Sequence, residues 1–177
     1  MTKNLSYVIA TLFGAGYFPK APGTFGSLVS LPIIFVVCYY FGFIGLLITV
    51  LFAFAVAMPA VKKVLTYTEH DPSFVVIDEF IGQAITFLPV ADRLTWKFNT
   101  MYKVFNNEIL LSTDIKFLIL YLAGFVFFRL FDIYKPYPVS YADKKIKNAF
   151  GVILDDIFAG IYAAIFVLLI VVLSYKL

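Results

Sequence analysis

Long apolar runs alternate with short polar stretches along this chain. Residues 28–60 contain no charged side chain, and residues 115–131 and 152–174 form two further apolar runs. A helix needs about 20 apolar residues to cross a bilayer. The first run is about twice that length and is interrupted near Gly42 and Gly45, so the pattern favours a helical hairpin over the alternative of one long tilted helix.

The segments around these runs are shorter or more polar. Residues 5–13 are apolar but too few to span a bilayer, which predicts an interfacial or buried helix. Prolines and glycines predict a loop over residues 17–27, and Thr24 or Ser27 is expected to cap the helix that follows. Residues 74–90 predict another membrane helix, because they are apolar except for Asp78, Glu79 and Gln83.

The remaining segments are polar. Residues 91–114 are amphipathic, residues 133–151 form a lysine-rich loop, and His70 is expected to be a surface loop residue rather than a ligand. No repeat or domain boundary is visible, so we expect one integral-membrane domain over residues 1–177.

Composition agrees with an integral membrane protein. Hydrophobic residues make up 62% of the chain, against 45–50% in a typical soluble domain, and the mean hydropathy is +0.94. The first 16 residues lack the pattern of a secretory signal, and we expect none. The net charge of +3 is too small to indicate a nucleic-acid partner. A single cysteine, Cys38, excludes an intrachain disulfide and a cysteine-rich metal site.

The expected fold is all-α and multi-span, with the hairpin followed by about three further membrane helices. Counting these crossings places nine of the 14 Lys and Arg residues on the side of the N-terminus. The positive-inside bias makes that side cytoplasmic. The same count places five carboxylates and three cations there: Asp78, Glu79, Asp132, Asp155 and Asp156, with Lys20, Arg129 and Lys135.

Those side chains suit phosphoryl chemistry. Carboxylates without cysteine and with one histidine favour Mg²⁺ or Mn²⁺ over Zn²⁺. A divalent cation offsets the repulsion between clustered acids and can activate water toward a phosphoryl group. Lys20, Arg129 and Lys135 would bind the phosphate, and Thr24 and Ser27 could add hydrogen bonds. At a membrane surface the matching substrate is a lipid phosphate.

Simpler roles are open for several of these residues. Asp155 could only favour the helix dipole, and Asp132 could only be a turn residue. Lysines 144, 145 and 147 are better explained as topology anchors. Gln83, one helical turn past Glu79, could support a ligand or only a neighbouring helix. Two adjacent acidic pairs at helix starts are the feature that favours a site.

Other phosphatase chemistries fit poorly. A histidine-nucleophile lipid phosphatase needs at least two histidines, and the chain has one. No DxDxT loop is present, and Cys38 lies within an apolar run rather than a phosphate loop. Metal-activated water is the chemistry that is left.

Four ordered blocks of the sequence resemble bacterial phosphatidylglycerophosphatase A. They are Gly16 with Pro19-Lys20-Ala21-Pro22-Gly23-Thr24-Phe25-Gly26-Ser27, Asp71-Pro72 with Val76-Ile77-Asp78-Glu79-Phe80-Ile81-Gly82, Arg129-Leu130-Phe131-Asp132-Ile133-Tyr134-Lys135-Pro136-Tyr137-Pro138, and Gly151-Val152-Ile153-Leu154-Asp155-Asp156 with Ala159-Gly160.

The resemblance implies an all-helical enzyme of the bacterial inner membrane that removes the terminal phosphate of phosphatidylglycerophosphate with Mg²⁺. It maps the five acids and three cations named above to the family's acidic and basic positions. Our own assignment gives one or two Mg²⁺ to Asp78, Glu79, Asp132 and Asp156. Asp155 would then orient the water.

Two alternatives are open at this stage. The enzyme could act on another lipid phosphate, such as phosphatidic acid or an isoprenyl phosphate. The acids could instead form a cation path in a non-enzymatic membrane protein, although they sit at helix ends rather than in mid-run. The oligomeric state does not follow from the sequence.

Overall fold

All regular structure in the described residues is helical, as the sequence predicts. The computed structural model of this chain describes residues 1–68, 72–93 and 111–174, apart from the side chains of residues 111–118 and 174. The elements, in chain order, are α1 (Lys3–Ala10), η1 (Ala15–Tyr17), α2 (Pro22–Val64), α3 (Ile77–Phe87), η2 (Leu88–Val90), α5 (Leu111–Tyr134), α6 (Val139–Lys145) and α7 (Ala149–Ser174).

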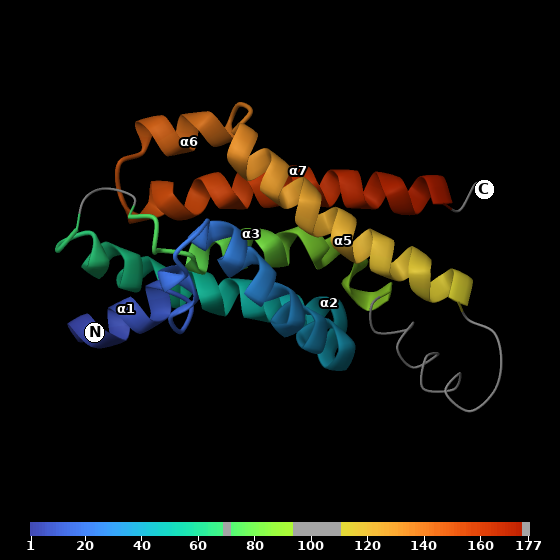
Figure 1. Cartoon of the computed structure of the whole chain (residues 1–177), viewed down its shortest axis with the longest axis horizontal. Coiled ribbons are helices and arrows are strands. Elements are labelled where there is room, and N and C mark those ends of the chain that lie inside the picture. Colours follow the sequence, from blue (N-terminus) through green and yellow to red (C-terminus); the bar gives the residue numbers. More distant parts are fainter. Residues whose placement is uncertain (69–71, 94–110, 175–177) are drawn as a thin grey trace.

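The predicted hairpin is α2. Gly42 has φ 57° and ψ −149°, a conformation outside the helical region that only glycine adopts readily. The two arms on either side of it run in opposite directions in Figure 1, the first in blue and the second in teal. The reversal is held by Asp92, whose Oδ1 accepts a hydrogen bond of 2.7 Å from the backbone N–H of Phe43.

Two predicted boundaries were wrong. The helix of the first arm begins at Pro22, so Thr24 and Ser27 lie inside it and cap nothing. Proline fits the first helical turn because its missing N–H needs no partner there. Residues 133–151 were expected to be a loop, but α6 forms within them at Val139–Lys145.

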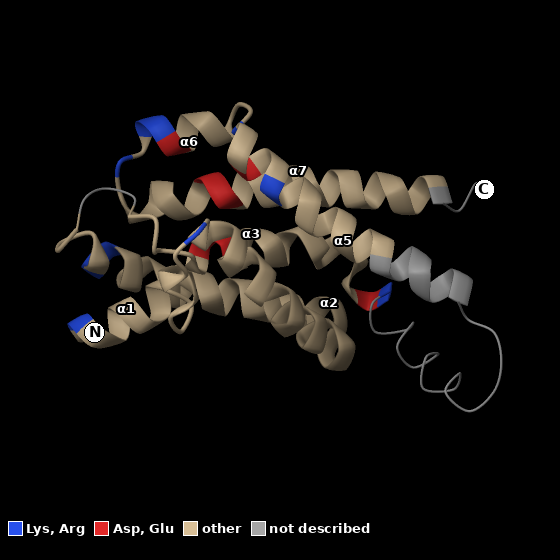
Figure 2. Ribbon diagram, viewed as in Figure 1, with Lys and Arg blue, Asp and Glu red and all other residues tan. Residues whose placement is uncertain are grey.

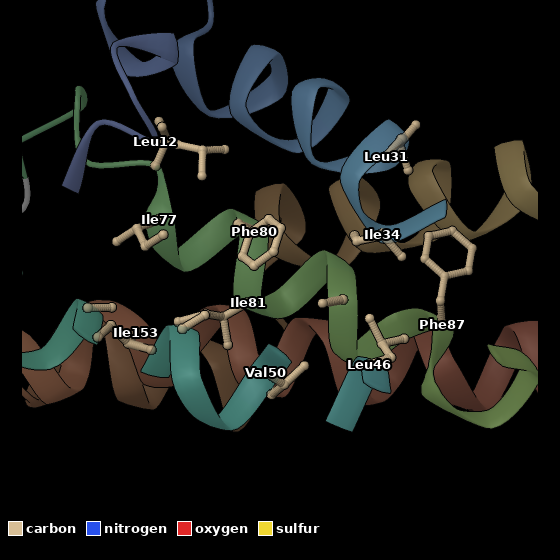
Figure 3. Packing of buried hydrophobic residues seen from close by; sticks show 14 of the residues in the cluster. Leu12, Leu31, Ile34, Leu46, Val50, Ile77, Phe80, Ile81, Phe87 and Ile153 are labelled. Atoms are coloured by element: carbon tan, nitrogen blue, oxygen red, sulfur yellow. The ribbon is translucent and has the colours of Figure 1, made fainter. Parts of the chain in front are cut away.

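Helix α3 is the buried centre of the molecule. Figure 3 shows Phe80, Ile81 and Phe87 of α3 between Leu31 and Ile34 of the first α2 arm and Leu46 and Val50 of the second. Nearly every residue of α3 is buried. Its N-terminus is therefore held in place by helices on several sides.

Helices α3 and α7 cross very closely. A Cβ atom at Gly160 would lie 2.3 Å from the carbonyl oxygen of Gly82, and one at Gly82 would lie 2.5 Å from the carbonyl oxygen of Asp156. Side chains larger than hydrogen cannot occupy this crossing without moving the helices apart. Gly82 follows Asp78 by four residues and Gly160 follows Asp156 by four, so the contact sets the two acids close together.

Two helices in the described residues are long and apolar enough to cross a membrane, namely Pro22–Val64 and Ala149–Leu173. About three further spans were expected after the hairpin, and among the residues that the structure describes α7 is the one that meets this criterion. Helix α3 has 11 residues, about 17 Å of helix, which is shorter than the roughly 30 Å hydrocarbon core. Helix α5 has 24 residues, but the side chains of its first part lie outside the described residues.

Candidate active site

Five carboxylates from three helices converge near the α3–α7 crossing. Asp78 and Glu79 come from the first turn of α3, Asp132 from near the end of α5, and Asp155 and Asp156 from α7. Figure 2 shows these acidic segments of α3, α5 and α7 in the same part of the bundle. Far-apart parts of the sequence thus contribute to one acidic cluster, as the topology predicts.

The cluster consists of two overlapping groups. Oxygen atoms of Asp78, Glu79 and Asp156 lie within 4.8 Å of one another, and so do oxygen atoms of Asp132, Asp155 and Asp156. Asp156 belongs to both. It is 4% exposed, and Asp78 and Asp155 are 6% and 7% exposed.

Buried acids at such distances repel one another and are poorly solvated, so the charged cluster needs compensation. Within the described residues, neither Glu79 nor Asp156 forms an ion pair. Carboxylate oxygens are the ligands that hard divalent cations prefer. The donor set, its spacing and its burial therefore fit a divalent metal ion.

Arg129 contacts one acid of the cluster. Its Nη1 lies 2.8 Å from Oδ2 of Asp132 and donates to Oγ of Ser27 at 3.3 Å. The Ser27 hydroxyl donates in turn to the carbonyl oxygen of Gly23 at 2.9 Å. The serine predicted to contact phosphate therefore orients the guanidinium in this structure.

The start of α2 borders the acids. A Cβ atom at Gly23 would lie 2.2 Å from Oε1 of Glu79 and 3.5 Å from Nη1 of Arg129. Because Gly23 has no side chain, the backbone of α2 can lie this close to Glu79 and Arg129. Lys20 and Thr24 flank Gly23 in the sequence. Lys20 is exposed and forms no ion pair with any described residue, which leaves its charge available to an incoming anion.

Lys135 forms ion pairs with two carboxylates. Its Nζ lies 2.6 Å from Oδ1 of Asp143 on α6 and 2.8 Å from Oδ2 of Asp155 on α7. Burial lowers the pKa of Lys135, but the hydrogen bonds and charges of these two carboxylates raise it above its usual value, so the ammonium stays charged. Lys135 therefore links α6 to the acidic cluster through these two ion pairs.

Sequence reasoning missed Asp143. It lies in the stretch interpreted as a lysine-rich loop, and its contact with Lys135 is visible only once α6 has formed. Gln83, left open by the sequence, proves to be fully buried. His70 and most of residues 91–114 lie outside the described residues.

The family model for Phosphatidylglycerophosphatase A matches residues 8–171. The chain belongs to this family. Relatives of that name from Haemophilus influenzae and Escherichia coli are 33% and 29% identical over 93% and 91% of the chain. Those alignments cover 87% and 80% of the relatives' own lengths.

A third relative of this phosphatidylglycerophosphatase A family member has another name. A Bacteroides thetaiotaomicron protein, provisionally named phosphatidylinositol-3-phosphatase, is 35% identical over 92% of the chain and 91% of its own length. No solved structure matches the chain. Family membership and the named relatives identify the protein as an enzyme, a phosphatase, and its apolar helices agree with a membrane protein.

Proposed function

We propose that this protein hydrolyses phosphatidylglycerophosphate to phosphatidylglycerol and inorganic phosphate, and that it requires Mg²⁺. The observation that carries the proposal is the pair of acidic groups that share Asp156, lying beside Arg129 in a member of this family. The names of the Haemophilus influenzae and Escherichia coli relatives support the substrate.

Asp78, Glu79, Asp132 and Asp156 are the residues that would hold one or two Mg²⁺ ions. Asp156 belongs to both acidic groups, so it would be a ligand whichever group held an ion. Bound Mg²⁺ supplies Lewis acidity to the phosphoryl group and to the attacking water. Asp155, fixed by its ion pair with Lys135, is suited to orient that water by accepting a hydrogen bond from it.

The terminal phosphate of the lipid would be bound by Lys20, Arg129 and Lys135, assisted by Thr24 and Ser27. Arg129 is held in place by Asp132 and Ser27, and an arginine fixed in this way offers its other N–H groups to phosphate oxygens. Lys20 is exposed and can fold over the bound anion. Lys135 acts on the phosphate through its charge while it remains paired with Asp143 and Asp155.

The membrane would contain the hairpin and α7, with the acidic cluster open to the cytoplasm in the inner membrane of a bacterium. Exposed apolar side chains occur on both elements, among them Phe52 of α2 and Leu169 of α7, which are 68% and 49% exposed. The acyl chains of the substrate lie along these faces in the proposal, and the headgroup reaches the start of α3.

A second candidate substrate is favoured by one observation. The relative with the highest identity of the three described above is the one provisionally named phosphatidylinositol-3-phosphatase. Both substrates are anionic phospholipids with a phosphate monoester on a polyol headgroup. The acids and cations of the site suit hydrolysis of either lipid. An assay is therefore needed to determine the headgroup specificity.

The test is phosphate release by the purified full-length protein in mixed micelles, measured with and without a chelator. The panel contains phosphatidylglycerophosphate, phosphatidylinositol-3-phosphate, phosphatidic acid and an isoprenyl phosphate. We expect the fastest release from phosphatidylglycerophosphate, abolished by the chelator and restored by Mg²⁺. Faster release from another lipid would reject the proposed substrate, and release that persists without divalent metal would reject the metal.

A further inference from the structure

Gln83 is a buried amide on α3 without a hydrogen-bond partner among the described groups. Its exposure is 0%, and both Nε2 and Oε1 are unpaired. Burying an amide without hydrogen bonds costs roughly 1–3 kcal/mol. Buried polar groups in folded proteins almost always have a partner. We therefore expect the amide of Gln83 to form hydrogen bonds when metal and substrate occupy the site.

Glu79 and Arg129 each have one buried polar atom that forms no hydrogen bond with the described groups. These atoms are Oε2 of Glu79 and Nε of Arg129. Gln83 Nε2 and Arg129 Nε are donors, whereas Glu79 Oε2 and Gln83 Oε1 are acceptors. A side-chain amide carries both a donor and an acceptor, so Gln83 is able to serve one partner of each kind.

The backbone places these three side chains on one face of the site. Gln83 follows Glu79 by four residues, so both lie on the same side of α3. Helical side chains lean toward the N-terminus of their helix, which directs the amide of Gln83 toward Glu79. Arg129 reaches the same place, since its Nη1 and Oε1 of Glu79 both lie within 3.5 Å of the Cβ position at Gly23.

We infer that Gln83 is a positioning residue that joins the metal-binding and phosphate-binding halves of the site. In the loaded enzyme its Nε2 donates to Oε2 of Glu79, and its Oε1 accepts from Nε of Arg129. This inference rests on the proposed function, in which Glu79 binds metal and Arg129 binds phosphate. Losing a hydrogen bond to a metal ligand typically weakens metal affinity about 10- to 100-fold.

The test is Q83M, which keeps the length of the side chain and removes its polar atoms. Mn²⁺ is titrated into the purified full-length protein in detergent micelles, and its dissociation constant is measured by calorimetry. We expect that constant to rise about 10-fold or more, together with the Mg²⁺ concentration needed for half-maximal turnover. The melting temperature without metal should be unchanged or higher, because an unpaired buried amide is removed.

Two further variants make the result specific. Q83N keeps the amide but is one methylene shorter, so it should lose Mn²⁺ affinity as Q83M does. T86V is the matched control, because Thr86 is also fully buried on α3 and its hydroxyl donates only to the carbonyl oxygen of Gly82. It should bind Mn²⁺ as the wild type does.

Mn²⁺ affinity within about two-fold of wild type in both Gln83 variants would overturn this inference and leave the proposed function standing. A wild-type protein that binds no Mn²⁺ at all would overturn the proposed metal site, and the inference with it. The two failures are thus distinguishable in a single set of titrations.

Discussion

Gly160 of α7 packs directly on Gly82 of α3, so that a Cβ at Gly160 would lie 2.3 Å from the carbonyl oxygen of Gly82. Each glycine lies one helical turn after an acid of the cluster, Asp156 or Asp78. The spacing of the acids therefore depends on how closely these two backbones approach. Any side chain at the crossing should disturb the site and the core together.

G160A tests this dependence. The added methyl group meets backbone rather than a movable side chain, so we expect a destabilisation of about 1–3 kcal/mol from overpacking, with weakened Mn²⁺ binding and turnover. Thermal unfolding in detergent and the phosphatase assay measure both effects. I161A is the control, because Ile161 is the next residue along α7 and is 44% exposed. Wild-type behaviour of G160A would contradict the close crossing.

D156N is expected to remove nearly all turnover, by more than about 100-fold, since losing a direct ligand should exceed the loss of a group that only supports one. Asp156 is the acid that both groups share, so neither group is complete without it. The variant should still insert and fold, because relieving the repulsion among buried acids offsets the lost charge. Turnover and Mn²⁺ affinity are measured beside the unfolding temperature, and a fully active D156N protein would refute this assignment.

Lys135 should contribute to stability through its pairs with Asp143 and Asp155. K135M leaves those two carboxylates without their cation, and we expect a lower unfolding temperature. The raised pKa of Lys135 means that its stabilisation is complete below the unfolded-state value of about 10.4 and is lost only above it. The difference from wild type should therefore stay constant between pH 6 and 9.

D143N separates the two partners of Lys135. It removes the α6 carboxylate and leaves the pair with Asp155 in place, so the loss of stability should be smaller than in K135M. Unfolding scans of both variants at one pH give the comparison. An equal or larger loss in D143N would show that the tether to α6 carries the effect.

Asp92 is expected to stabilise the tip of the hairpin. Its carboxylate accepts from the N–H of Phe43, directly after the helix break at Gly42, where the second arm begins. D92A should cost about 1 kcal/mol, as the loss of a helix N-cap does, whereas D92N keeps an acceptor and should cost less. Thermal unfolding measures both, and turnover at saturating metal should be unchanged. Equal stability of D92A and wild type would remove this role.

Local pattern alone determined much of this protein. The uncharged run over residues 28–60 with its central glycines predicts the hairpin, because apolar length and a helix-breaking glycine act through neighbouring residues. Two adjacent acidic pairs predict the cluster, since the order of apolar runs along the chain brings them together. Only Asp78 and Glu79 lie in a first helical turn, however, because α7 begins at Ala149 and places Asp155 and Asp156 beyond its first turn. The start of α2 was misjudged because Pro22 is compatible with a first helical turn, a local choice that composition leaves open.

Tertiary structure alone decided the partners within the site. The pairing of Lys135 with Asp143, the hold of Ser27 on Arg129 and the burial of Gln83 all join residues whose distance depends on how helices pack. Such distances are set by close contacts like the one between Gly82 and Gly160, where fractions of an ångström matter. Hydropathy and residue spacing do not depend on those contacts. They therefore predict which residues lie near one another but not which atoms form hydrogen bonds or ion pairs.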